Sequence, residues 1–182
     1  MTQEEVRALL VETGAIMDGH FLLTSGLHSP HYVEKFNVLQ HPQYTQQLCE
    51  ATAERYRDAG IETVVGPVTG GILLAHETGK ALGTRAIFTE RVDGKMTFRR
   101  GFSLRPGERV LIVEDIVTTG GSIKEVIEVV KEAGAIPLRS RCSLTAAAAR
   151  HSSATFPHRR SSRWMSRPIR PRHVRSAPRV FP

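Results

Sequence analysis

Short apolar segments alternate with helix-like segments through the middle of the chain. Three segments have the pattern of strands, ETVVGPV (62–68), TRAIFTE (84–90) and RVLIVED (109–115), and two have the pattern of helices, TGGILLAHETGKAL (69–82) and GSIKEVIEVVKEAG (121–134). Strands that are apolar on both faces and alternate with helices of this length are typical of right-handed βαβ units around a parallel sheet. The sequence therefore predicts an α/β fold, with a mainly parallel sheet flanked by helices.

The residues before this alternating pattern are predicted to form two further helices. Residues 3–12 are predicted to form a helix, because Thr2 and Glu5 have the spacing of a capping box. A second helix is predicted from Pro42 to about Ala59, since proline is favoured at the first position of a helix.

The charge of the chain is concentrated at one end. The net charge of +7 suggests an anionic partner such as nucleic acid. However, residues 138–182 hold eleven Arg and no Lys, Asp or Glu, so residues 1–137 have fourteen basic and eighteen acidic residues, a net charge of −4. The main part of the chain therefore does not have the composition of a nucleic-acid-binding protein.

Composition also bears on location. No run approaches the roughly 18 consecutive apolar residues of a membrane span, and the acidic N-terminal helix does not resemble a signal peptide. Two cysteines, Cys49 and Cys142, form neither a disulfide framework nor a metal quartet. We expect a cytoplasmic protein with reduced thiols, no membrane partner and Cys49 in the core.

The string VLIVEDIVTTGGS at residues 110–122 is the strongest functional signal. It delivers Glu114 and Asp115 to the end of a buried strand, where adjacent carboxylates are costly unless a polyol or a cation meets them. A ribose 2′,3′-diol is a suitable partner. The N–H groups and hydroxyls that follow can surround a phosphate at the start of a helix. An ordinary strand-to-helix turn is the alternative, but the whole string favours binding of phosphoribosyl pyrophosphate (PRPP).

The same string resembles the signature of type I phosphoribosyltransferases. Three further segments resemble orotate phosphoribosyltransferases, in particular their shorter bacterial form: GHFLLTSGLHSP (19–30), VVGPVTGGILLA (64–75) and FTERVDGKMTFRRGF (88–102). The resemblance implies a type I phosphoribosyltransferase fold over residues 1–137, in which residues 1–40 form a small hood on the α/β core. It also implies transfer of phosphoribosyl from PRPP to orotate, Mg²⁺ carried by PRPP instead of by protein side chains alone, and a homodimer.

Site residues carry over from this resemblance by position. The expected PRPP-binding residues are Thr69, Gly70, Gly71, Glu114, Asp115, Ile116, Val117, Thr118, Thr119, Gly120, Gly121 and Ser122. The expected orotate-binding residues are Ser25, Gly26, Tyr32 and Thr118. Residues 91–101 are expected to form a mobile loop whose cations reach the pyrophosphate, namely Arg91, Lys95, Arg99 and Arg100. A solvated basic hairpin is the alternative interpretation of this segment.

Other functions stay open at this point. A phosphoribosyltransferase for a purine base is disfavoured by the hood sequence. A non-catalytic protein that senses PRPP is disfavoured by the basic loop. The spacing of His20, His28 and His31 fits no standard metal motif, so these residues are interpreted as turn or hood histidines.

The tail departs from the family pattern. The family has a strand after the helix that ends near Gly134, followed by a loop, Asp-Arg-Ser-Gly-Gly, whose Arg holds the orotate carboxylate. This chain has LRSRCSLTAAAARHSS from Leu138 instead, and we expect both the strand and that Arg to be missing. When Leu138–Arg150 is back-translated with GC-rich codons, omission of the first two bases gives Ala-Val-Ala-Val-Leu-Ala-Asp-Arg-Ser-Gly-Gly-Thr, in which the family loop reappears.

We therefore hypothesise a frameshift near residues 135–139. The Arg- and Pro-rich tail, residues 138–182, is then out of frame and is expected to be disordered. Weak or no turnover of orotate follows, although PRPP binding is retained. The alternative is a genuine basic tail that binds RNA or membrane, which its lack of Gly and of interleaved aromatic residues disfavours.

Overall fold

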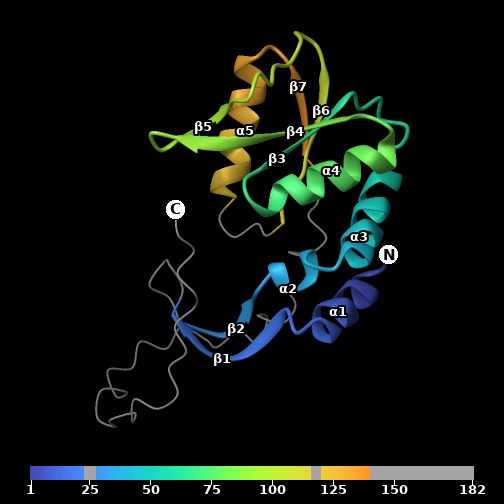
Figure 1. Ribbon diagram of the computed structural model, residues 1–182, viewed down its shortest axis with the longest axis vertical. Helices are drawn as coiled ribbons and strands as arrows, with labels where there is room; N and C mark the ends of the chain where they lie inside the picture. Colours follow the sequence, from blue (N-terminus) through green and yellow to red (C-terminus); the bar gives the residue numbers. More distant parts are fainter. Residues whose placement is uncertain (23–27, 116–119, 140–182) are drawn as a thin grey trace, which may run out of the picture.

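The structure is a computed structural model that describes residues 1–22, 28–115 and 120–139. It has two parts (Figure 1): a five-stranded sheet with helices on both faces, and a smaller N-terminal part built on a two-stranded hairpin. In the described part of the chain, none of the helices is long and apolar enough to cross a bilayer.

The large sheet has the strand order β5-β4-β3-β6-β7. Neighbouring strands are parallel except for β4 and β5, which form an antiparallel pair. The predicted α/β class is therefore confirmed, and the three predicted strands are present. The strands are β3 Thr63–Pro67, β4 Arg85–Val92, β5 Lys95–Phe98, β6 Arg109–Ile112 and β7 Ile136–Arg139.

Helices cover both faces of this sheet (Figure 1). Helices α3 (Pro42–Glu54) and α4 (Gly70–Leu82) pack against each other on one face, and α5 (Gly121–Glu132) covers the other. The prediction that α3 reaches Ala59 is wrong. The chain beyond Glu54 forms turns instead, in which the Tyr56 N–H donates to the Ala53 carbonyl at 2.9 Å.

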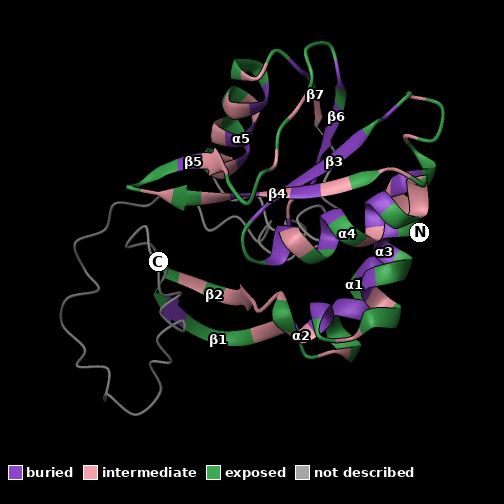
Figure 2. Ribbon diagram, turned by 45° about the horizontal axis from the view of Figure 1, so that its top comes forward, coloured by how far each residue is buried: buried purple, intermediate pink, exposed green. Residues whose placement is uncertain are grey.

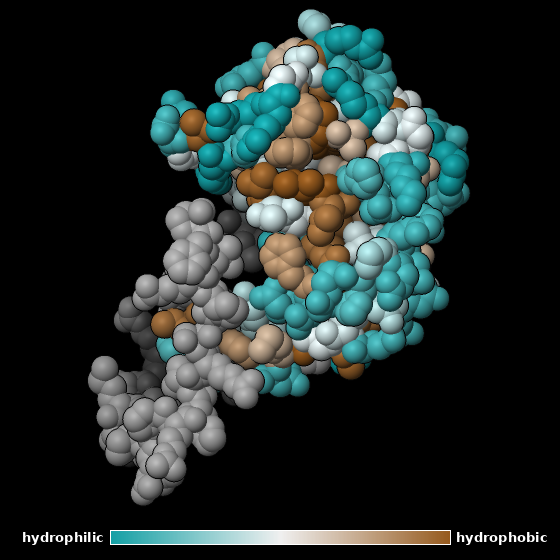
Figure 3. Space-filling model, viewed as in Figure 1, coloured by the Kyte–Doolittle hydropathy of each residue, from teal (hydrophilic) through white to brown (hydrophobic). Residues whose placement is uncertain are grey.

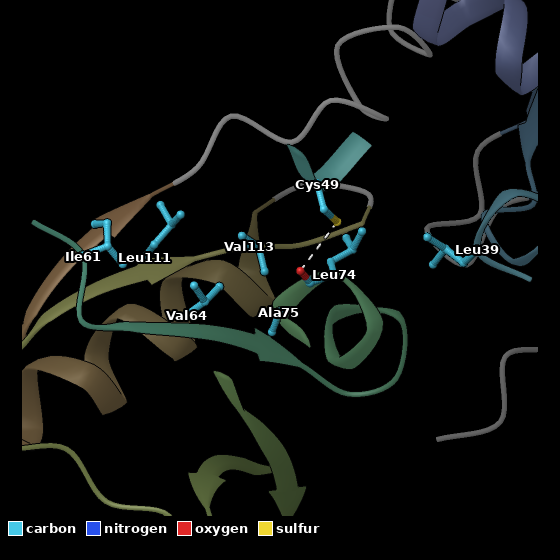
Figure 4. Close-up of a cluster of buried hydrophobic side chains, with 8 residues drawn as sticks. All are labelled: Leu39, Cys49, Ile61, Val64, Leu74, Ala75, Leu111 and Val113. Atoms are coloured by element: carbon cyan, nitrogen blue, oxygen red, sulfur yellow. Dashed lines mark hydrogen bonds between the residues drawn. The ribbon is translucent and has the colours of Figure 1, made fainter. Parts of the chain in front are cut away.

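The core reflects the alternation of side chains along the strands. In β3, Val64 faces the α3 and α4 side, whereas its neighbour Val65 joins the cluster under α5. Figure 4 shows the first cluster, in which the Cys49 thiol donates a hydrogen bond to the Leu74 carbonyl at 3.7 Å. Cys49 is 2% exposed, so its predicted place in the core is confirmed. The central strands are buried along most of their length (Figure 2).

We call the N-terminal part, residues 1–40, the hood. It contains α1 (Gln3–Glu12), the antiparallel strands β1 (Ile16–Leu22) and β2 (His28–Val33), and the short helix α2 (Phe36–Leu39). The predicted capping box is confirmed, because the Glu5 N–H donates to Thr2 Oγ1 at 3.2 Å and the Thr2 N–H donates to Glu5 Oε2 at 2.7 Å.

Two strands differ from the sequence analysis. Strand β5 forms a hairpin with β4 from residues that were expected to be a mobile loop, for which a solvated basic hairpin was the alternative interpretation. The expectation that the chain lacks a strand after α5 is wrong as well. Strand β7 pairs in parallel with β6, from Ile136 opposite Arg109 to Arg139 opposite Ile112. It contains Pro137, which a strand tolerates at the edge of a sheet.

A buried carboxylate, that of Glu108, lies at the end of the sheet where β3, β4 and β6 begin. Glu108, with a side chain only 2% exposed, accepts hydrogen bonds from the Arg105 N–H at 2.7 Å, from the Thr63 hydroxyl, and from Arg85 Nη2 at 2.8 Å. Burial by itself raises the pKa of Glu108, but these hydrogen bonds and the Arg85 charge outweigh it and lower the pKa from 4.5 to about 2.

This lowered pKa predicts a specific acid sensitivity. Because Glu108 has a lower pKa in the folded state, its contribution to stability is fully present above about pH 4.5 and is lost as the pH falls through about 2. A shift of this size corresponds to about 3 kcal/mol. We expect urea unfolding to show that Glu108→Gln costs about this much at pH 6 and progressively less towards pH 2.

The matched control is Glu128→Gln, since Glu128 is 64% exposed and forms only a surface pair with Lys131 at 3.2 Å. Its stability should differ little from that of the wild type at any pH. A cost of Glu108→Gln that stays constant between pH 6 and pH 2 would contradict the assigned pKa.

Candidate functional site

Two predicted site segments meet where β3 and β6 end. These strands are parallel neighbours, and the Val113 N–H continues the pairing by donating to the Val65 carbonyl at 2.9 Å. After β3, Thr69 caps α4 and Gly70 and Gly71 begin that helix, while Glu114 and Asp115 follow β6. In sheets of this kind, ligands bind beyond the carboxyl ends of the strands. The structure thus brings Asp115 and the start of α4 together.

Close packing requires the glycines at the end of β3 and at the start of α4. A Cβ added to Gly70 would overlap the Asp115 carboxylate and would also lie 3.2 Å from Leu39 Cδ1. A Cβ added to Gly66 at the end of β3 would overlap the carbonyl group of Gly71. The start of α4 therefore lies directly against Asp115. The peptide bond between Val68 and Thr69, just before it, is cis.

Lys35 is a member of the site that the sequence analysis missed. Its Nζ lies 2.8 Å from Asp115 Oδ2, and the Asp115 side chain is only 6% exposed. Lys35 precedes α2, so the ion pair brings a hood residue to the end of β6. A single lysine between a strand and a short helix has no distinctive pattern, so only the tertiary structure could identify it.

Two helices begin at this edge of the sheet. Thr69 is the N-cap of α4, and Gly120 is the N-cap of α5 with φ +75°, a left-handed conformation that favours glycine. The predicted residues Gly121 and Ser122 lie in the first turn of α5. The N–H groups at the start of a helix and its dipole attract anions such as phosphate. The predicted residues Ile116, Val117, Thr118 and Thr119 lie outside the described residues.

The predicted orotate residues are only partly described. Tyr32 lies on β2, opposite Met17, and its ring centroid is 5.5 Å from that of Phe21. Partial burial, with a smaller contribution from the charge of Glu34, raises the pKa of Tyr32. Ser25 and Gly26 lie outside the described residues.

The predicted catalytic cations lie on or beside the β4–β5 hairpin and do not meet at Asp115. Arg91 Nη1 lies 2.7 Å from Glu125 Oε2 on α5. Arg100 and Arg99 both approach Glu90, at 3.1 Å and 4.0 Å. Lys95 is exposed at the start of β5. In this structure the three arginines are thus bound by acids of the same chain.

The hood histidines contact one another and a neighbouring acid. His20 Nε2 lies 2.6 Å from His28 Nδ1, and His31 Nδ1 lies 2.7 Å from Asp18 Oδ1. Within residues 1–22, 28–115 and 120–139, no group of three His, Cys, Asp or Glu side chains is arranged to hold a metal ion.

Comparisons with known proteins assign the chain to a family. The phosphoribosyl transferase domain pattern matches residues 36–161. The orotate phosphoribosyltransferase of Desulforamulus reducens is 56% identical over 134 residues, which are 74% of this chain and 70% of that protein. That of Pelotomaculum thermopropionicum is 52% identical over the same shares.

A solved structure supports the same assignment of fold. The crystal structure of orotate phosphoribosyltransferase from Aeropyrum pernix matches with a TM-score of 0.57 and 24% identity, over 81% of this chain and 88% of that one. With the site at the ends of β3 and β6 and the extent of sequence identity, the conclusion is that this chain belongs to the phosphoribosyltransferase domain family and, within it, to the orotate phosphoribosyltransferases.

Proposed function

We propose that the chain transfers the 5-phosphoribosyl group of PRPP to orotate, which yields orotidine 5′-monophosphate and pyrophosphate in pyrimidine biosynthesis. The observation that carries this proposal is the meeting of Asp115 with Gly70 at the adjoining ends of β3 and β6. Relatives that are 56% and 52% identical to this chain over 134 residues are named orotate phosphoribosyltransferases.

The arrangement suits the chemistry of this transfer. The ring nitrogen of orotate forms a bond to the anomeric carbon of the ribose, and the bond from that carbon to pyrophosphate breaks. Glu114 and Asp115 would accept hydrogen bonds from the ribose hydroxyls, while the start of α5 would face the 5-phosphate. The first turn of α4 would face the pyrophosphate, whose charge increases as it leaves.

The cations of the β4–β5 hairpin would act on the leaving group. Arg91, Arg99 and Arg100 would exchange their present acidic partners for the pyrophosphate when the hairpin closes over the bound substrate, and Lys95 would join them there. These residues lie at the surface, so the exchange should cost little free energy, because exposed ion pairs contribute little to stability.

Magnesium would be held mainly by the substrate. Carboxylates such as those of Glu114 and Asp115 are hard ligands, but Mg²⁺ commonly retains waters and binds through one or two carboxylates plus substrate phosphates. When bound, the ion neutralises charge on the departing pyrophosphate.

The assembly and location are further parts of the proposal. Figure 3 shows apolar side chains gathered around the start of α4, where Val68 and Leu73 are 40% and 43% exposed. An exposed apolar group of this kind favours a contact with another protein surface. It supports a homodimer. We propose that this dimer functions in the cytoplasm, with PRPP and orotate as its small-molecule partners.

A PRPP-sensing protein without catalysis is the second candidate. It is favoured by the engagement of Arg91, Arg99 and Arg100 with acids of the same chain. A purine-base transferase has no specific support among the described residues.

Pyrophosphate release tests these functions. PRPP should bind the full chain saturably in isothermal titration calorimetry, and orotate should release more pyrophosphate than adenine or hypoxanthine does. Release with a purine alone would overturn the choice of base. PRPP binding without release with any base, by both this chain and a frame-restored chain, would favour the sensing protein, and failure of PRPP to bind would overturn the proposal as a whole.

A further inference from the structure

The Lys35–Asp115 ion pair connects the hood to the core. Among the ion pairs of the described ranges, it is the one that joins a hood residue to the end of a strand of the large sheet. Residues far apart in the sequence therefore meet within 2.8 Å at the proposed PRPP site. The other lysine ion pairs in these ranges do not connect the hood to the large sheet.

Burial distinguishes this pair from ordinary surface pairs. The side chains of Lys35 and Asp115 are 27% and 6% exposed. Those of Lys131 and Glu128 are 56% and 64% exposed, which leaves both groups well hydrated. Loss of one member of a buried pair is costly, because the remaining charge loses its opposite charge in surroundings that contain little water. Asp115 thus depends on Lys35 more strongly than Glu128 depends on Lys131.

The backbone of Lys35 is held on both sides. Its carbonyl accepts hydrogen bonds from the N–H groups of Val38 and Leu39 at 3.1 Å and 3.0 Å, and the preceding Glu34 N–H donates to the Ala15 carbonyl at 2.8 Å. Leu39 is buried in the core cluster that Figure 4 shows. The backbone that carries the Lys35 side chain is therefore held in place by hydrogen bonds and is not a free surface loop.

A second element also restricts the position of the Asp115 carboxylate. A Cβ on Gly70 would overlap the same oxygen, Oδ2, that Lys35 contacts. The hood and the first turn of α4 thus approach one oxygen atom of the acid. A carboxylate bounded in this way has a defined orientation before any substrate binds, which lowers the entropic cost of binding.

We propose that Lys35 is a positioning residue for PRPP: it orients Asp115 for the ribose hydroxyls and couples the hood to the phosphoribosyl half of the site. This inference rests on the proposed function, because it assigns Asp115 to the ribose. Lys35 acts through Asp115 and is not itself placed on the substrate.

The test uses PRPP titrations of the full chain with three variants. Lys35→Met should weaken PRPP binding about tenfold, the effect of losing one charge-assisted contact. Lys35→Arg should restore most of the affinity, since it keeps the positive charge. The matched control, Lys131→Met, should bind like the wild type. Melting temperatures measured in parallel separate binding from folding.

A double-mutant cycle tests the route of the effect. If Lys35 acts through Asp115, Lys35→Met should change PRPP affinity less than about twofold in an Asp115→Asn background. Wild-type affinity in Lys35→Met, or independent additive effects in the cycle, would overturn the inference and leave the proposed function standing. A wild-type chain that does not bind PRPP would overturn both.

Discussion

Replacement of Gly70 by alanine is expected to weaken PRPP binding by about a hundredfold, or about 2.7 kcal/mol. The new Cβ would overlap the Asp115 carboxylate and would lie 3.2 Å from Leu39 Cδ1. The acid side chain can yield more easily than the backbone, so the main result should be a misplaced Asp115 and not an unfolded chain. PRPP titration and urea unfolding of the same variant measure the two effects separately.

Two other glycines serve as controls for this prediction. Gly83→Ala lies at the other end of α4, where an added Cβ meets nothing within 4 Å, but φ is +69°. It should lose about 1 kcal/mol of stability and keep normal PRPP affinity. Gly66→Ala places a Cβ against the Gly71 backbone, which cannot give way, and should lose about 3 kcal/mol of stability. A Gly70→Ala chain that binds PRPP normally would contradict the assigned site.

Restoration of the alternative reading frame after Arg139 is expected to raise kcat/KM for orotate by about a hundredfold or more. The restored loop would supply the Arg that, by resemblance to the family, holds the orotate carboxylate. Such an Arg can form two charge-assisted hydrogen bonds with a carboxylate, so its loss removes a strong and directional contact. PRPP affinity should change little, because Asp115 and Gly70 are common to both chains.

The measurement is orotate-dependent pyrophosphate release by the two chains under the same conditions. A third chain that ends at Arg139 separates the gain of the family loop from the loss of the basic tail. It should resemble the unrestored chain in turnover. Equal turnover by the unrestored and restored chains would contradict the frameshift hypothesis, as would gene nucleotides that do not encode the family loop in another frame.

Local patterns predicted much of the architecture. The capping box of Thr2 and Glu5 and the run of apolar residues in β3 are signals within a few consecutive residues. Pairing between distant segments was harder to predict. Strand β7 was not expected because the sequence departs from the family pattern from Leu138 onward, yet its residues pair with the parallel edge that β6 offers. Residues 95–98 likewise form a strand through their pairing with β4.

The sequence by itself determined the fold class and the nature of the proposed ligand, because the strand–loop–helix chemistry around Glu114 and Asp115 is contained in one continuous string. The tertiary structure decided which groups surround that acid pair. Lys35 and Gly70 come from separate segments, and neither has a local signal for its contact with Asp115. Such contacts arise only when the hood and the sheet pack together, since a buried charge must find its partner in space and not along the chain.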